Sequence, residues 1–138
     1  MTARKETVAV IGTGDMGGGV GGALVRAGYR VVTVAEGLVN RWSIAFLRGG
    51  DMLVTGRAGR LRIVRNGKLL PDPVPGLPRL RTGGQGGLLD VVPHPNFTSN
   101  RLLYLSYSKP NAHSSEGTTA VARARFQNDR LTNVQEIF

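Results

Sequence analysis

The first residues whose spacing could support chemistry are three glycines, Gly12, Gly14 and Gly17, in the pattern Gly-x-Gly-x-x-Gly. In such a loop the first glycine allows a tight turn, and the second lets the backbone approach a pyrophosphate. The third lets a helix pack closely on the preceding strand. The N-terminus of that helix then faces the phosphates. The three glycines are therefore candidates for binding a dinucleotide, NAD(P).

The segments around this loop have the order strand, turn, helix, strand. Thr7–Ile11 is a short β-branched apolar run, typical of a buried strand. Gly19–Arg26 has the length of a short helix, and Tyr29–Val34 favours a second strand. Four glycines fall where the helix is expected: Gly18, Gly19, Gly21 and Gly22. Each costs the helix about 1 kcal/mol relative to alanine, so the alternative is a βα element that binds nothing.

After Glu36 the pattern changes to short strand-length runs separated by turns. These runs are Trp42–Leu47, Met52–Thr55, Arg60–Val64, Gly87–Val92, Arg101–Ser108, Thr118–Phe126 and Leu131–Phe138. Asn66-Gly67 is a strong hairpin signal, and the proline-rich Pro71–Pro78 predicts an extended connector. No helix signal separates the strands. The pattern predicts a mainly β fold with antiparallel sheets, as a sandwich, a barrel or propeller blades.

The charge of the chain raises nucleic acid as a partner, because the formal net charge is +9. Fifteen of the 18 basic residues are arginine, scattered from Arg4 to Arg130 without an aromatic stacking platform. We interpret them as a solvated surface and expect no nucleic-acid partner. The sequence has no run of 18 apolar residues, so we expect no membrane span. Because the apolar run Val8–Ile11 is too short for a secretion signal, we expect a cytoplasmic location by default.

Few residues of the β part have a catalytic or metal-binding pattern. His94 lies between two prolines, and His113 lies in a polar loop. The two histidines are 19 positions apart and are not spaced as a metal-binding pair, and the chain has no cysteine. We therefore expect structural or solvated roles for both histidines and no metal site.

Two stretches of the sequence resemble known families. Val8–Val32 (VAVIGTGDMGGGVGGALVRAGYRVV) resembles the NAD(P)-binding start of 6-phosphogluconate and 3-hydroxyisobutyrate dehydrogenases. That resemblance implies phosphate binding by Gly12, Gly14 and Gly17. We expect at most weak binding, because nothing after Glu36 continues an α/β sheet.

The second resemblance rests on motifs that follow one another in order. They are Val34–Leu38, Trp42–Leu47, Met52–Thr55, Gly59–Val64, Gly84–Asp90, His94–Phe97, Asn100–Tyr107 and Thr118–Arg123. Together they resemble the N-terminal part of the PQQ-dependent soluble aldose sugar dehydrogenases, the glucose/sorbosone dehydrogenase family. The resemblance implies a six-bladed β-propeller. It also implies oxidation of an aldose by hydride transfer to pyrroloquinoline quinone (PQQ), with calcium polarising the quinone.

Of that family's active-site residues, only one falls in this chain. Gln85, in Gly-Gly-Gln-Gly-Gly, matches a glutamine that lines the quinone and substrate pocket. The alternative role for Gln85 is an amide that caps its own glycine turn. The family's catalytic histidine, calcium ligands and quinone-binding arginines lie in later blades. We therefore expect neither bound PQQ nor bound calcium here, and whether this chain is an enzyme stays open.

The two stretches suggest two parts: a Rossmann-like βα segment at residues 1–33, and propeller blades, fewer than two, at residues 34–138. The leading hypothesis is a fragment or fusion related to the sugar dehydrogenases and inactive alone. A sugar would bind once the missing blades are supplied. The alternatives are a small NAD(P)-binding module with a β appendage and a non-enzymatic β-sheet interaction protein. Open sheet edges predict self-association. The sugar dehydrogenase family is typically periplasmic, although no export signal is seen in this sequence.

Overall fold

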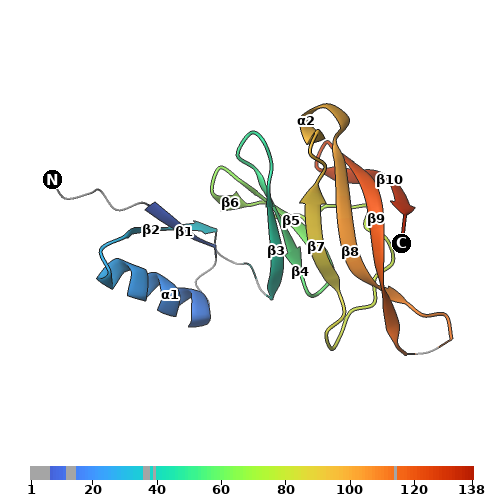
Figure 1. The fold of residues 1–138 in the computed structure, drawn as a ribbon, viewed down its shortest axis with the longest axis horizontal. Helices are drawn as coiled ribbons and strands as arrows, with labels where there is room; N and C mark the ends of the chain where they lie inside the picture. The colour runs from blue at the N-terminus through green and yellow to red at the C-terminus, as the bar shows by residue number, and fades with distance from the viewer. Residues whose placement is uncertain (1–6, 12–14, 36–37, 39, 114) are drawn as a thin grey trace. The chain divides into compact units, whose positions relative to one another are not determined.

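The computed structural model describes residues 7–11, 15–35, 38, 40–113 and 115–138 (Figure 1). The Cα positions divide the chain into two compact units. One unit is Met1–Leu38 together with Gly67–Leu69, and the other is Val39–Asn66 together with Leu70–Phe138. Each unit is described by itself.

The first unit is a strand, a helix and a parallel strand. These are β1 (Thr7–Ile11), α1 (Asp15–Arg26) and β2 (Arg30–Ala35). β1 and β2 pair in parallel from Thr7↔Arg30 to Val10↔Thr33, as the sequence predicts for a βαβ unit. The helix begins four residues before the predicted range and ends near Gly28, whose φ of 84° suits a glycine cap.

The first four-stranded sheet has the order β3-β4-β5-β6, and its strands β3, β4 and β5 belong to the second unit. Its strands are β3 (Arg41–Phe46), β4 (Met52–Gly56), β5 (Arg60–Arg65) and β6 (Lys68–Leu69). The predicted hairpin lies between β5 and β6, where Asn66 and Gly67 have φ values of 52° and 73°. A two-residue turn with both residues left-handed matches the twist of the strands, which explains the Asn-Gly pair. The sequence did not predict β6, which has only two residues.

The second sheet has the order β10-β9-β8-β7. Its strands are β7 (Leu88–Pro93), β8 (Leu102–Pro110), β9 (Gly117–Gln127) and β10 (Arg130–Glu136). Every neighbouring pair for which a register is described, in both sheets, is antiparallel. The predicted strands are thus all present, and the prediction of a mainly β fold with antiparallel sheets is confirmed.

A short helix, α2 (Phe97–Asn100), corrects the expectation that no helix separates the strands. It is a single turn, so it is too short to give an apolar periodicity in the sequence. The turn forms because the Asn96 carbonyl accepts hydrogen bonds from the N–H groups of Ser99 and Asn100, at 3.0 and 3.1 Å. Phe97 is buried and anchors the turn to the core.

The hydrophobic core of the second unit lies between its two sheets. β5 alternates as predicted, with Leu61 and Ile63 buried and Arg60 exposed. Both sheets contribute fully buried side chains to one cluster, which includes Leu53, Leu61 and Ile63 from the first sheet and Leu88, Leu103 and Leu105 from the second. Each sheet therefore buries its inner face mainly against the other.

The predicted connector Pro71–Pro78 runs as extended chain without helix or strand. Val74 is buried in the core, and its N–H donates to the Leu61 carbonyl at 2.8 Å. Gly76 lies so close to β10 that a Cβ there would be 2.3 Å from the Leu131 carbonyl oxygen. The connector therefore packs against both sheets, and a glycine is required at the point of closest approach.

A buried threonine joins the sheets where the register of two strands is irregular. β3 shifts register against β4 between Arg41 and Ile44, and β7 shifts against β8 between Leu88 and Asp90. The Thr55 hydroxyl lies between these points. It accepts the Ser43 N–H at 2.9 Å and donates to the Leu89 carbonyl at 3.1 Å. One side chain thus satisfies a backbone group of each irregular strand.

A second link between the sheets is ionic. Arg65, at the end of β5, donates to Asp51 through Nε and Nη2 at 3.0 and 2.8 Å. It also forms a two-pronged pair with Asp129, at 3.0 and 2.8 Å. Asp129 belongs to the turn between β9 and β10, so the guanidinium joins turns of both sheets. These bonds hold the pKa of the Asp129 carboxyl below its usual range.

We expect Thr55→Val to lower the free energy of unfolding by about 1–3 kcal/mol, because it removes the hydrogen-bond partner of two partly buried backbone groups, the Ser43 N–H and the Leu89 carbonyl. Urea denaturation measures the change. Thr119→Val is the matched control, since Thr119 is exposed on β9, and it should change stability by less than about 0.5 kcal/mol. Equal stability of the two variants would contradict the role given to Thr55.

We expect Asp129→Asn to lower the melting temperature at pH 7 but not at pH 2. A lowered folded-state pKa contributes stability above the unfolded value of 3.8, and this stability is lost as the pH falls through the folded pKa. Circular dichroism melts across this range measure the difference from the unaltered chain. Asp72→Asn, in the exposed connector, is the control. A difference from the unaltered chain that does not change with pH would rule out this linkage.

Candidate functional site

The sequence-predicted site residue Gln85 is exposed on a tight glycine turn that leads into β7. The Gly86 N–H donates to the Gly83 carbonyl at 2.8 Å, which closes the turn. Gly83 and Gly84 have φ values of 111° and 55°, a region that other residues rarely adopt. The backbone therefore presents the Gln85 amide at the tip of the turn.

Two arginines brace this turn from neighbouring segments. Arg57, in the loop between β4 and β5, donates from Nη2 to the Gly84 carbonyl. A Cβ at Gly87 would be 2.2 Å from the Arg57 carbonyl oxygen, and a Cβ at Gly86 would be 2.9 Å from that of Arg81. The two glycines that follow Gln85 thus allow two other backbone segments to approach closely.

The chemistry open to Gln85 follows from its amide. An amide can donate a hydrogen bond to one oxygen and accept one from a hydroxyl, but it does not titrate. It can therefore orient a polar ligand and cannot act as a general base. No described hydrogen bond joins the Gln85 side chain to its own turn, and the alternative role as a cap stays a prediction.

The other predicted site residues belong to the first unit. Gly12 and Gly14 lie outside the described residues. Gly17 lies within helix α1 (Asp15–Arg26). The βαβ order expected around the glycine loop is present, and binding of a dinucleotide by these three glycines stays a prediction.

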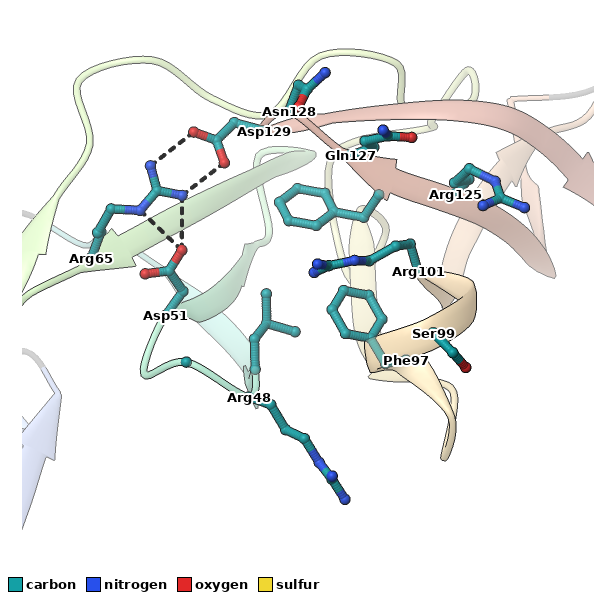
Figure 2. A pocket seen from close by; sticks show the side chains of 13 residues that line it. Arg48, Asp51, Arg65, Phe97, Ser99, Arg101, Arg125, Gln127, Asn128 and Asp129 are labelled. Carbon is teal, nitrogen blue, oxygen red and sulfur yellow. Dashed lines mark hydrogen bonds and ion pairs between the residues drawn. The ribbon is translucent and has the colours of Figure 1, made fainter.

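The end of the second unit opposite to Gln85 carries an open hollow (Figure 2). β4 and β7 run in opposite senses between the two ends, so the loop before β4 and helix α2 after β7 meet there. The hollow has a volume of about 530 Å³. Its lining includes Arg48, Asp51, Arg65, Phe97, Ser99, Arg101, Arg125, Gln127, Asn128 and Asp129. It is called the arginine hollow below.

A second hollow, of about 510 Å³, adjoins the ends of β8 and β10. In it Glu136 accepts from the Tyr107 hydroxyl at 3.1 Å and from the Lys109 ammonium at 2.5 Å. The Lys109 bond, followed by the Tyr107 bond, holds the pKa of Glu136 below its usual range. Burial and then the Glu136 bond raise the pKa of Tyr107. These groups satisfy one another, which fits a structural role.

The histidines are placed as surface residues of their loops. His94 accepts at Nδ1 from the Asn96 N–H at 2.9 Å and lies 2.9 Å from the Asn100 amide nitrogen. Among the described residues no group of three or more His, Cys, Asp or Glu side chains could hold a metal ion. In the same part of the chain no helix is long and apolar enough to cross a bilayer.

Sequence analysis missed the arginine hollow. Its charged residues come from the loop before β4, the end of β5, the residue after α2 and the turn after β9. The only signal was that Asp51 and Asp129 both lie in predicted turns. Which turns meet at one end of the sheets depends on how the two sheets pack, and no local pattern carries that information.

The comparisons with known proteins cover most of the β part. The family described as Glucose / Sorbosone dehydrogenase matches residues 38–138. The aldose sugar dehydrogenase YliI of Escherichia coli is 38% identical over 115 residues, which is 81% of this chain and 31% of that protein. The family match does not extend to the glycine loop.

Solved structures agree with the sequence matches. A glucose dehydrogenase has 42% identity and a TM-score of 0.69, covering 74% of this chain and 32% of its own. The PQQ-bound aldose sugar dehydrogenase of Streptomyces coelicolor has 25% identity and a TM-score of 0.65, covering 78% of this chain and 32% of its own.

The chain spans about 30% of the length of the curated relatives it matches. Its antiparallel sheets therefore correspond to a fragment of the propeller-like fold of these enzymes. On the match across residues 38–138, this chain belongs to the glucose/sorbosone dehydrogenase family.

Proposed function

We propose that residues 34–138 are the first blades of a PQQ-dependent aldose sugar dehydrogenase and supply one polar group, the Gln85 amide, to its pocket. The observation that supports this is the Gln85 turn itself. It is exposed, it is braced by Arg57, and the two glycines that follow Gln85 are required by close backbone contacts. A rigid turn that presents an unprotected amide is suited to binding a ligand hydroxyl or carbonyl.

The residues present do not form a cofactor site by themselves. Calcium takes six to eight oxygen ligands, and the described residues offer no cluster of three candidate side chains. The guanidinium groups beside Gln85 are engaged with carbonyl oxygens, Arg57 with Gly84 and Arg81 with Ser115. In this proposal the metal and the quinone are held by later blades, and this segment only orients a bound sugar or quinone oxygen.

Oxidation of a sugar hydroxyl also needs a base to remove its proton. Neither His94 nor Gln85 meets this need, because His94 bonds within its own turn and an amide has no suitable pKa. The proposal is therefore that the chain alone is inactive and gains activity only when the remaining blades are present.

Exposed apolar side chains favour self-association of the isolated chain. Phe46 is 71% exposed on β3, and Val92 is 51% exposed on β7. Both β3 and β7 are edge strands of their sheets, with free backbone groups on one side. We propose that the chain associates through these strands when nothing else covers them.

We expect residues 1–138 with added PQQ, calcium and glucose to give no reduction of a redox dye. Adding the later blades of the Escherichia coli relative should restore turnover. In that complex Gln85→Ala should lower kcat/KM about tenfold, the value of one lost hydrogen bond to a ligand. Gln127→Ala, an exposed glutamine at the opposite end, is the control. Quinone-dependent oxidation by residues 1–138 alone would contradict the proposal.

We expect sizing with light scattering to show dimers or larger species for the purified chain. Phe46→Ser should shift the distribution toward the monomer. The substitution removes from β3 a large apolar side chain that is 71% exposed. Phe138→Ser is the matched control, since Phe138 is 80% exposed at the chain end and off both edge strands. A monodisperse monomer before any substitution would rule out this association.

A further inference from the structure

The arginine hollow carries positive charge that the described residues do not neutralise. Four arginines and two aspartates line it, which gives a net formal charge of +2. Both aspartates bind Arg65, through four N–H to oxygen contacts of 3.0 Å or less. The described side-chain bonds of both acids thus go to one arginine, and the formal charge of −1 on this group leaves the +3 of the other three arginines in excess.

Arg101 is the arginine that reaches into the hollow. In Figure 2 its guanidinium lies in the opening near Phe97, whereas the side chain of Arg48 extends away from it. The Arg101 Cζ lies 5.7 Å from the centre of the Phe97 ring, so one face of the guanidinium is supported. Its N–H groups have no described hydrogen bond or ion pair to a side chain or backbone oxygen.

The backbone of Arg101 is held on both sides. Its N–H donates to the Phe97 carbonyl at 2.9 Å, and its carbonyl accepts the Phe126 N–H at 2.8 Å. The residue has a φ of 58°, a left-handed conformation that ends α2. Because the backbone is already fixed, only the side chain of Arg101 has to be ordered when its guanidinium binds an anion.

Arg125, on β9, is the second free cation of the hollow. Figure 2 shows it on the same side of the hollow as Arg101, and it is half-buried in the sheet. The ion pairs of Arg65 fix the opposite wall, because they join the loop before β4 to the turn after β9. The hollow thus has a rigid wall on one side and unpaired guanidinium groups on the other.

We propose that the arginine hollow binds a phosphate group, either inorganic phosphate or the phosphate of a small ester. The apolar lining residues Leu47, Phe97 and Phe126 are buried, so the surface offered to a ligand is mainly polar. A small hydrophilic anion suits such a polar surface better than an apolar ligand does. Phosphate carries up to two charges at pH 7, and its oxygens match the paired N–H groups of a guanidinium.

This site differs from the proposed Gln85 site in place and in chemistry. It lies at the opposite end of the sheets, and every residue that lines it belongs to this chain. The binding test below therefore needs neither the missing blades nor the sugar dehydrogenase activity.

Isothermal titration calorimetry of residues 1–138 tests the proposal, with inorganic phosphate in one arm and glucose 6-phosphate in the other. We expect saturable binding in at least one arm and none for glucose. Tighter binding of glucose 6-phosphate would identify an ester as the ligand class, and tighter binding of phosphate would identify the free ion. Affinity should fall as sodium chloride is raised, because the contacts are between charged groups.

Arg101→Gln should weaken binding about tenfold or more, since it removes the paired N–H donors. Arg101→Lys should recover part of the affinity, because it keeps the charge and loses the paired geometry. Arg125→Gln gives an independent measure on a different element and should weaken binding severalfold. Thermal melts check that each variant is folded, and a folded Arg125 variant keeps the test decisive if Arg101→Gln unfolds.

The control is Arg60→Gln, which removes the same charge from an exposed position at the other end of β5. Its affinity should stay within about twofold of the unaltered chain, which measures the effect of net charge alone. Absence of saturable binding, or an equal loss in Arg60→Gln and Arg101→Gln, would overturn the proposal. The second result would assign any binding to the overall charge of +9.

Discussion

The arrangement of the second unit depends on how two irregular edge strands are joined. β3 and β7 each shift register against their own partners, so each has backbone groups that its own sheet does not pair regularly. Thr55 is the one buried polar residue among the described side chains, and its hydroxyl bonds to both strands. Because neither sheet can bury its inner face alone, this junction fixes which faces meet. The core, the ends of the sheets and both hollows follow from it.

Once the sheets are fixed face to face, their two ends acquire different chemistry. One end collects the glycine turn of Gln85, where close backbone contacts leave no room for side chains. The other end collects longer loops and turns, where Arg65 binds both Asp51, 14 positions before it, and Asp129, 64 positions after it. The close-packed glycines and the Asp51–Arg65–Asp129 group thus lie at opposite ends, although arginines and glycines occur at both.

The sequence predicted the elements of the fold well and the sites only in part. Strands such as β5 and β9 carry alternation or β-branched runs, which are local signals, and Asn66-Gly67 specifies its own turn. The two-residue strand β6 and the single turn α2 are too short for any period to appear. Gln85 was found only through a family resemblance. Arg101 was missed. Its position depends on its own left-handed backbone and on hydrogen bonds to the buried residues Phe97 and Phe126, which are far apart in the sequence. No local spacing pattern describes such an arrangement.

The surplus of arginine over acidic residues has a structural use that the interpretation as a solvated surface overlooked. Arg57, Arg62 and Arg81 donate to backbone carbonyls, of Gly84, Leu70 and Ser115 respectively, in loops and connectors. A planar guanidinium can satisfy carbonyls that no strand pairs, and it needs no carboxylate to do so. A glycine-rich β fold with long connectors has many such carbonyls. Arginines in these positions pair with backbone carbonyls and have no acidic partner among the described residues. The high net charge of the chain is in part a consequence of this pairing. Arg101 is an exception, since its backbone is held while its guanidinium stays free.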